Sequence, residues 1–209
     1  MGRQSERTER STRALLGAAA LIIDEEGLQA LTVARIGERA GYSRGMVTER
    51  FGSKEALLGA LLDTILSSIT SDMASAMAGK SGLEQVDVYL AEIARQGTEQ
   101  PNWLRVLAKM TYQSIGLDPE LSNRFALANT YIRHNLARLV RAGIADGSIR
   151  PDADPENEAV MIVAMFRGVG YQWCVDPDGF DAGAALRYAH EVTVDRLASV
   201  SVRARAGAV

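Results

Sequence analysis

The sequence predicts an all-α protein of about nine helices, with a three-helix DNA-binding domain at the N-terminus and a larger helical bundle after it. Apolar residues recur three and four positions apart, and alternating apolar and polar runs are scarce. Helix-starting residues (Ser, Thr, Asp) and helix-ending glycines punctuate this pattern at regular places. Hydrophobic residues make up 47% of the 209 residues and charged residues 23%, which is typical of a folded globular chain.

The first predicted helix runs from about Ser11 to Glu26 and ends at Gly27. Thr32 is the predicted N-cap of a second, short helix that reaches Ala40. The residues that follow, 41–43, form a predicted turn, because glycine adopts positive φ easily and Ser43 can cap the next helix. That third helix runs from about residue 44 to residue 50.

Two short helices joined by a tight glycine turn are typical of a helix-turn-helix. A long helix then starts after the predicted cap Ser53 and continues through Ile69. The expected small core of this domain consists of Leu15, Ile22, Val33, Ile36, Val47 and Phe51.

The remaining helices are longer, and their starts are marked by proline or aspartate. We expect them at about residues 83–96, 101–115, 118–145, 154–175 and 181–199. The predicted domains are therefore residues 1–57 for DNA binding and residues 58–209 for ligand binding and dimerisation.

The net charge of −3 hides a local basic patch. Residues 32–54 carry five positive and two negative side chains, a balance of +3, whereas residues 59–209 have a balance of −4. Such a patch suits a protein that touches phosphate with one small module. The N-terminal segment carries Glu6 and Glu9, which argues against a signal peptide and predicts a cytoplasmic location.

The stretch TRALLGAAALIIDEEGLQALTVARIGERAGYSRGMVTERFGSKEALL resembles the N-terminal domain of the TetR family of bacterial transcriptional regulators. The matching features are Gly27, Leu31-Thr32-Val33, Ile36, Ala40-Gly41, Ser43, Gly45, Val47, Phe51 and Ser53-Lys54-Glu55 followed by Leu57. The helical remainder is similar to the family as well, although less specifically.

The resemblance implies a homodimer whose two helix-turn-helix domains enter successive major grooves of a palindromic operator. It also implies a C-terminal domain that dimerises through its last two helices and holds a small-molecule effector. Effector binding then moves the DNA-binding domains apart and releases the operator. We therefore expect a ligand-responsive regulator, most often a repressor, with double-stranded DNA, an effector and a second copy of itself as partners.

Arg44 is the predicted base contact, because arginine can bind guanine O6 and N7 in a bidentate way. Gly45 matches a family position at which the backbone approaches DNA closely. Helix-start amides and nearby side chains are the expected phosphate contacts. The predicted DNA-binding residues are Thr32, Val33, Arg35, Ser43, Arg44, Gly45, Met46, Thr48, Glu49, Arg50, Ser53 and Lys54.

Two of these residues depart from the family pattern, and the acidic Glu49 lies between them. Thr48 replaces the usual tyrosine, and Arg50 replaces the usual histidine or tyrosine. Either Thr48 contacts the groove directly, or Arg50 takes over the phosphate contact. Glu49 is turned outward, paired with an arginine, or an acceptor for a cytosine amino group.

The C-terminal site is less defined, and its large apolar residues favour an apolar or aromatic effector. The predicted pocket residues are Trp103, Met110, Tyr112, Phe125, Tyr131, His134, Met165 and Trp173. The penultimate helix is apolar nearly all round between Ala159 and Val175, which predicts burial on two sides, against its own bundle and a twin subunit. The predicted interface residues are Phe166, Arg167, Gly170 and Tyr188, with Arg167 paired to an acid across the interface or facing the pocket.

An enzyme is disfavoured. The sequence has no Gly-rich phosphate loop, no nucleophile elbow and no metal-spaced histidine cluster, and its one cysteine, Cys174, cannot form an intrachain disulfide. We therefore expect no cofactor, metal or membrane partner. A helical interaction module that binds no DNA, and an activator of the same fold, remain the alternatives.

Overall fold

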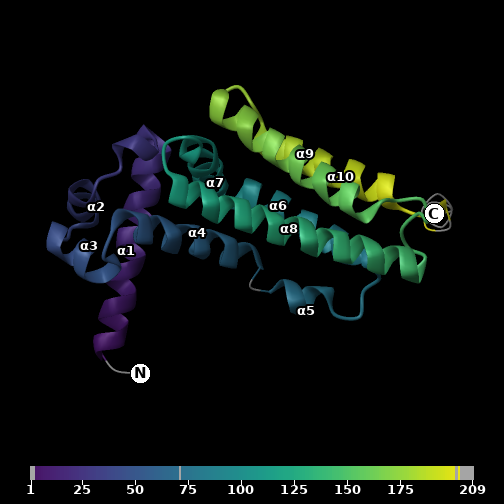
Figure 1. The fold of residues 1–209 in the computed structure, drawn as a ribbon, viewed down its shortest axis with the longest axis horizontal. Helices are drawn as coiled ribbons and strands as arrows, with labels where there is room; N and C mark the ends of the chain where they lie inside the picture. Colours follow the sequence, from purple (N-terminus) through teal and green to yellow (C-terminus); the bar gives the residue numbers. More distant parts are fainter. Residues whose placement is uncertain (1–2, 71, 201, 203–209) are drawn as a thin grey trace. The chain divides into compact units, whose positions relative to one another are not determined.

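The structure is a computed structural model that describes residues 3–70, 72–200 and 202, without the side chains of residues 3, 4 and 101. The expected all-α fold is confirmed (Figure 1). The helices are α1 (Arg3–Glu26), the 3-10 helix η1 (Leu28–Ala30), α2 (Val33–Ala40), α3 (Arg44–Phe51), α4 (Lys54–Thr70), α5 (Met73–Met77), α6 (Gly82–Glu99), α7 (Pro101–Ser114), α8 (Pro119–Asp146), α9 (Pro155–Val175) and α10 (Ala182–Leu197).

Two differences from the predicted helices stand out. The first helix starts at Arg3 and not at Ser11, because residues 3–10 carry no apolar stripe that would indicate a helix. Their arginine, glutamate and glutamine residues are nevertheless good helix formers. The second difference is α5, a five-residue helix that adds a tenth α-helix to the nine expected.

The predicted helix caps are present as local hydrogen bonds. The Thr32 hydroxyl accepts from the Arg35 amide at 3.3 Å, and the Ser43 hydroxyl accepts from the Met46 amide at 3.2 Å. Gly41 ends α2 with φ at 74°, in the left-handed region that glycine adopts at least cost. These caps fix where α2 ends and where α3 begins.

Backbone contacts divide the chain into two compact units. Unit 1 contains residues 1–67 and 105–125, and unit 2 contains residues 68–104 and 126–209. Unit 1 thus adds most of α7 and the start of α8 to the four N-terminal α-helices. The predicted domain boundary after residue 57 falls inside α4 and stays a prediction.

Unit 1 has a core formed by α1, α2, α3 and α4. Four of the six expected core residues are buried, and Val33 and Phe51 are half-buried. Buried leucines of α4 complete this core. The fully buried large side chains of residues 15–65 are Leu15, Ile22, Ile23, Leu31, Ile36, Leu57, Leu58, Leu61 and Ile65.

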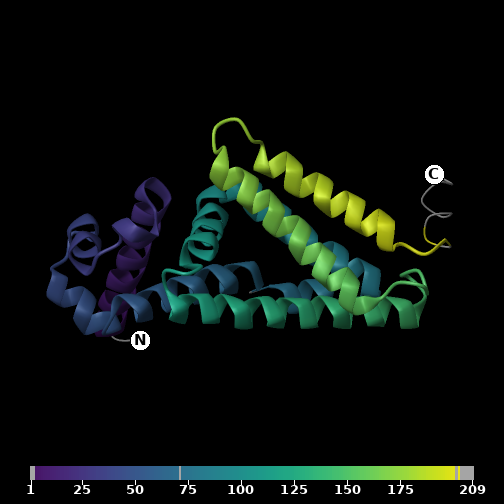
Figure 2. The same ribbon diagram turned by 45° about the horizontal axis from the view of Figure 1, so that its top comes forward.

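Unit 2 is a helical bundle in which α10 packs on α6 and on α9, and α9 and α10 run side by side in both views (Figures 1 and 2). One buried cluster is built mainly from α6, α8 and α9 and includes Leu90, Val140 and Ile162. The start of α6 meets α8 backbone to backbone, since a Cβ on Gly82 would lie 2.0 Å from the Gly143 nitrogen. Only glycine at position 82 permits this approach.

One described stretch, Lys54–Met77, has the length and hydropathy of a helix that could cross a membrane. It contains two separate helices, α4 and α5. Leu57, Leu58 and Leu61 within it are fully buried in unit 1. The apolar character of this stretch is therefore explained by leucines that pack in the core of unit 1.

Candidate DNA-binding surface and effector site

The turn between α2 and α3 is held by backbone bonds and by one close contact. The Tyr42 amide donates to the Gly37 carbonyl at 2.8 Å, and the Gly41 amide donates to the Glu38 carbonyl at 3.1 Å. A Cβ on Gly37 would lie 2.9 Å from the Tyr42 carbonyl oxygen. Gly37 therefore sets how closely the turn packs on α2. Gly37 is missing from the predicted DNA-binding residues, although a glycine inside a short helix was the available signal.

The exposed face of α3 carries the predicted base contact and three further predicted DNA-binding residues. Arg44, Gly45, Thr48 and Glu49 are exposed, while Val47 on the opposite face is buried. Among the described residues Arg44 and Glu49 form no ion pair, so the charges of both side chains face solvent. A Cβ on Gly45 would meet only the Ser43 hydroxyl, at 3.7 Å, so the space over this turn of the helix is open.

Thr48 and Arg50 differ in how they are held. The Thr48 hydroxyl donates to the Arg44 carbonyl at 3.4 Å and remains on the exposed face. Arg50 is half-buried, and its Nη2 donates to the buried Ser11 hydroxyl of α1 at 3.1 Å. Arg50 thus braces the end of α3 against α1. This geometry favours a direct groove contact by Thr48 over a phosphate contact by Arg50.

Arg35 is also held within unit 1. Its guanidinium forms an ion pair with Glu26 and donates to the Ala30 carbonyl at 3.2 Å. The hydrogen bond and the charge of Arg35 lower the pKa of the Glu26 carboxyl. Thr32 and Val33 lie at the start of α2, where the first-turn amides have no partner within the helix.

The start of α4 places Ser53 and Lys54 beside Glu55. The Ser53 hydroxyl accepts from the Ala56 amide at 3.1 Å, as expected for a cap. Hydrogen bonds from the Glu55 amide and from Ser53 lower the pKa of the Glu55 carboxyl. The Glu55 carboxylate thus already accepts a hydrogen bond from an amide of this helix start, and Lys54 beside it is half-buried.

The C-terminal end of α1 is tied to α7 by contacts that the sequence analysis did not anticipate. Arg105 Nε donates to the Asp24 carboxylate at 2.5 Å, and Lys109 Nζ lies 3.5 Å from the same carboxylate. The Gln113 side chain accepts from the Leu28 amide at 2.6 Å. Burial raises the pKa of Asp24, but the hydrogen bond and charge of Arg105 outweigh it, so the pKa lies below its ordinary value. No local sequence signal marks a pair of residues so far apart in the chain.

The predicted pocket residues are distributed over both units. Met110, Tyr112 and Phe125 belong to unit 1, and the other five belong to unit 2. Tyr131 and His134 are exposed on α8, whereas Met110 and Trp173 are buried. Trp103 and Met165 are half-buried. A pocket formed by the whole set stays a prediction.

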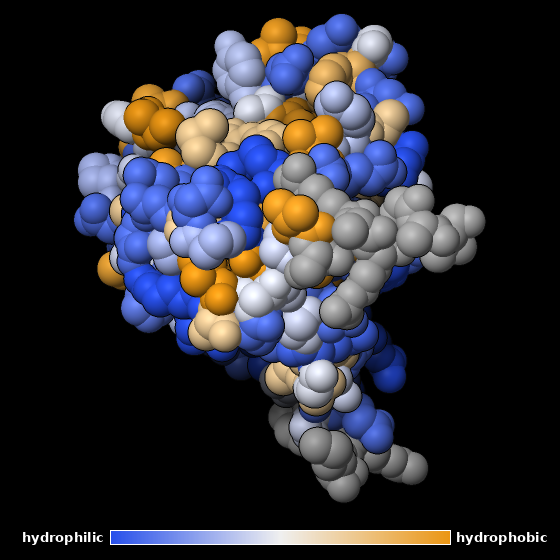
Figure 3. All heavy atoms as spheres, turned by 90° about the vertical axis from the view of Figure 1, so that its right-hand side faces the viewer, coloured by the Kyte–Doolittle hydropathy of each residue, from blue (hydrophilic) through white to orange (hydrophobic). Residues whose placement is uncertain are grey.

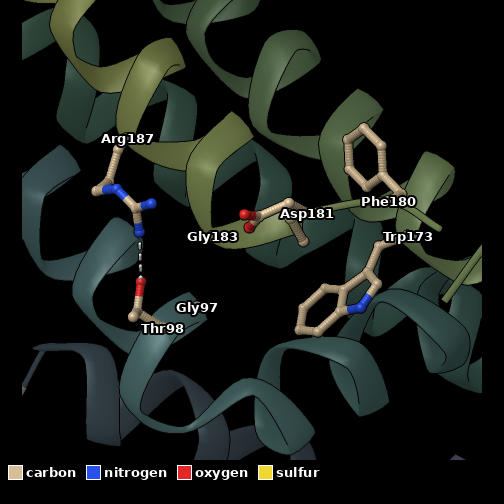
Figure 4. A pocket seen from close by; sticks show the side chains of 8 residues that line it. Gly97, Thr98, Trp173, Phe180, Asp181, Gly183 and Arg187 are labelled. Atoms are coloured by element: carbon tan, nitrogen blue, oxygen red, sulfur yellow. Dashed lines mark hydrogen bonds between the residues drawn. The ribbon is translucent and has the colours of Figure 1, made fainter. Parts of the chain in front are cut away.

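Unit 2 contains a pocket of about 330 Å³ that is open to solvent, and Trp173 is the predicted residue that lines it. In Figure 4 the rings of Trp173 and Phe180 lie on one side and Arg187 with Thr98 on the other. The Asp181 carboxylate lies between them and accepts from the Ala184 amide at 2.8 Å. Arg187 donates to the Thr98 hydroxyl at 3.2 Å.

The predicted interface residues differ in exposure. Tyr188 on α10 is 69% exposed, whereas Phe166 and Gly170 on α9 are half-buried. Arg167 donates to the Asn129 side chain at 3.0 Å, so it has a partner within unit 2. Further large apolar residues on α9 and α10 are exposed. They are Val160, Met161, Tyr171, Val175 and Val192.

Hydrophobic residues occupy separate patches among polar ones on the face of the molecule in Figure 3. On α9 the exposed apolar residues recur at positions 160, 161, 164, 171 and 175, which is a helical stripe.

Two family models together match most of the chain. Residues 83–198 match the C-terminal model described as a BetI-type transcriptional repressor. Residues 15–61 match the model of bacterial regulatory proteins of the tetR family. The two matches cover the helix-turn-helix and the helical bundle of unit 2.

Similar proteins point to the same family. The HTH-type transcriptional regulator BetI 1 of Chromohalobacter salexigens is 26% identical over 189 residues, covering 89% of this chain and 90% of its own length. BetI 2 of the same organism is 29% identical over 188 residues, covering 84% and 83%.

Solved structures share the fold. A TetR transcription regulator from Haloarcula marismortui has a TM-score of 0.76 at 21% identity, covering 91% of this chain and all of that one. A transcriptional regulator from Saccharomonospora viridis, solved in complex with choline, has a TM-score of 0.75 at 17% identity, covering 91% and 99%.

Proposed function

Because the chain belongs to the TetR family of bacterial transcriptional regulators, and is a DNA-binding regulator and not an enzyme, we propose that it is a homodimeric repressor of a palindromic operator. Regulators of this family bind operator DNA and a small-molecule effector. We propose that the protein acts in the cytoplasm, because the operator DNA is located there.

The observation that carries this proposal is the exposed face of α3. Gly37 and Gly41 allow the tight turn that precedes α3. The buried Val47 packs the opposite face of α3 into the core of unit 1. Arg44 then stands at the start of the helix with no ion pair among the described residues, which leaves its guanidinium available to a guanine edge.

Phosphate contacts would flank this base contact. The amides at the start of α2, near Thr32 and Val33, and the Lys54 side chain are the proposed groups. We assign Arg50 and Arg35 a bracing role, because both are already bonded inside unit 1. Thr48 and Glu49 then remain to contact the groove.

Dimerisation through α9 and α10 is supported by the exposed apolar residues of these two helices. Tyr171, Val175 and Tyr188 are each more than half exposed in the single chain. Covering such side chains with the same stripe of a second copy would remove apolar surface from water. Two DNA-binding domains held at a fixed separation would match the two half-sites of a palindrome.

For the effector, the large apolar residues of the central helices support an apolar or aromatic compound. A small organic cation is the second candidate, because the pocket in unit 2 combines the rings of Trp173 and Phe180 with the Asp181 carboxylate. The choline complex of the Saccharomonospora regulator supports the same class. A thermal shift with choline that its uncharged isostere 3,3-dimethylbutanol does not cause would favour the cation, and equal shifts would favour the apolar class.

The DNA-binding test compares two single substitutions. Arg44→Ala should weaken binding to a selected operator and relax its base preference by about 1–3 kcal/mol, while Lys54→Ala should weaken binding to every duplex about equally. Titrations of matched and mismatched duplexes over a salt series measure both effects. Wild-type binding by both variants would contradict the assignment.

The same titrations separate the alternatives. An interaction module would show no DNA binding that falls steeply with added salt. An activator would bind DNA in the same way but raise transcription of a reporter placed beside the selected operator.

A further inference from the structure

We propose that the first turns of α1 form a second DNA contact, in which Arg7, Arg10 and Arg13 bind phosphates beside the groove that α3 enters. This inference rests on the proposed function, since it assumes that α3 binds DNA. It adds a contact outside the helix-turn-helix, on a part of the helix that has no apolar stripe.

The three arginines share one side of a regular helix. They lie three residues apart, so they fall within an arc of about 120° around the helix axis. All three are exposed, and α1 is helical from residue 3 onward. In Figure 1 the N-terminal end of α1 extends past α3 and α4.

The two ends of α1 differ in how their charges are used. At the C-terminal end, Asp24, Glu25 and Glu26 pair with Arg105, Arg39 and Arg35 respectively.

At the other end, Arg7, Arg10 and Arg13 form no ion pair among the described residues. The neighbouring carboxylate of Glu9 accepts from the Ser5 hydroxyl at 3.1 Å, and Glu6 is exposed without an ion pair in the same part of the chain. The basic end therefore has charge available for an external anion.

The position of this basic end follows from Arg50. Its hydrogen bond to Ser11 fixes α1 against the C-terminal end of α3. From Ser11 the helix continues toward its start at about 1.5 Å per residue, so Arg7 lies about 6 Å farther along the axis. The first turns of α1 therefore continue from the point at which α1 contacts the C-terminal end of α3.

The chemistry of arginine suits the phosphate backbone. Its planar guanidinium binds phosphate oxygens in a bidentate way and remains charged at any physiological pH. Contacts of this kind strengthen binding without sequence preference. The expected partner is therefore the operator backbone, and an acidic protein segment is the competing occupant.

The test is the variant Arg7→Gln/Arg10→Gln/Arg13→Gln, in which glutamine keeps a similar helix propensity. Binding to a duplex selected from a random library, and to a random duplex of equal length, is measured between 50 and 200 mM salt. Each lost phosphate contact reduces the slope of log K against log salt by about 0.9. Loss of all three would make the salt-induced weakening about 40-fold smaller for each bound chain, and by about the square of that factor for a bound dimer, with the base preference unchanged.

Two matched variants serve as controls. Lysines at the three positions should retain most of the wild-type slope, because the contact is mainly one of charge. Arg133→Gln/Arg138→Gln/Arg141→Gln removes three arginines of unit 2 and should leave the slope near that of the wild type. Trimming the flanks of the selected duplex should remove the difference between the wild type and the α1 variant.

The possible failures are distinguishable. A wild type that binds no DNA would overturn the proposed function itself. A helical α1 variant, checked by circular dichroism, with the wild-type slope on long duplexes would overturn the second contact alone. In that case an acidic protein segment would be the expected partner of the three arginines.

Discussion

At Gly45, in the first turn of α3, the packing of the folded protein leaves room for a side chain. A Cβ at this position would meet only the Ser43 hydroxyl, at an ordinary contact distance of 3.7 Å. The folded protein alone therefore does not require glycine here. Close approach of DNA to the α3 backbone would explain why a residue without a side chain stands here.

We therefore expect Gly45→Ala to fold with unchanged or slightly higher stability, because alanine favours a helix over glycine by about 0.5–1 kcal/mol. Its affinity for a selected operator should nevertheless fall at least severalfold. Urea unfolding and operator titration on the same preparation measure the two effects. Undiminished affinity would mean that the backbone at Gly45 does not approach DNA closely.

Asp24 is the residue at which pH should act on unit 1. Its pKa is lowered because Arg105 and Lys109 outweigh the cost of burial. A carboxyl with a lowered pKa stabilises the fold above its unfolded pKa and loses that contribution as the pH falls through its folded pKa. The stabilisation is thus present at neutral pH and lost in acid, below about pH 4.

Asp24→Asn should reduce the free energy of unfolding at pH 7 by about 1–3 kcal/mol, since it removes a charged acceptor from a largely buried pair. The deficit should shrink toward zero in acid, where the native carboxyl is protonated as well. Urea denaturation at several pH values measures this, with Glu6→Gln as an exposed control. A deficit that is constant with pH would show that the charge of Asp24 is not what stabilises the contact.

At the scale of elements, two helical glycines of unit 1 have opposite roles. Gly37 lies under the turn, where a Cβ would come within 2.9 Å of the Tyr42 carbonyl. Gly17 lies within α1, where a Cβ would meet nothing within 4 Å. An alanine at position 17 therefore tests helix propensity alone, whereas an alanine at position 37 also tests packing.

Gly37→Ala should destabilise the protein by about 1–3 kcal/mol through overpacking and weaken operator binding, because the turn that positions α3 must move. Gly17→Ala should instead stabilise it by about 0.5–1 kcal/mol. Thermal unfolding and operator titration of both variants measure the contrast. Equal effects of the two substitutions would refute the role assigned to Gly37.

For the whole molecule, the exposed stripe on α9 and α10 sets the expected assembly. Tyr188 is 69% exposed, and Leu127 on α8 is 72% exposed. Only Tyr188 belongs to the helices of the proposed interface. The two positions thus form a matched pair.

Tyr188→Glu should dissociate the dimer, because it would place a carboxylate in an apolar interface. Leu127→Glu should leave the dimer intact. Sedimentation velocity at micromolar concentration measures the mass of each variant. A Tyr188→Glu protein that sediments with the same mass as the control would locate dimerisation elsewhere.

The sequence by itself determined the local features of this protein. Helical periodicity located nine of the helices, and cap residues such as Thr32, Ser43 and Asp154 marked their starts, because a cap bonds to an amide only two or three residues away. The residues of the helix-turn-helix motif also identified the family. The cap signals lie within one or two helical turns, and the motif lies within one continuous stretch of fewer than fifty residues.

Tertiary structure decided what depends on distant residues. The Asp24–Arg105 pair and the Gly82–Gly143 contact join residues that no local pattern connects. The polar start of α1 gave no apolar signal, so its helical form and its unpaired arginines emerged only in three dimensions. Likewise, Thr48 and Arg50 are both polar in the sequence, and only the packing of α3 on α1 shows that Arg50 is held while Thr48 stays exposed. The physical reason is that burial and charge pairing depend on which surfaces meet, and a residue's neighbours in the chain do not specify that.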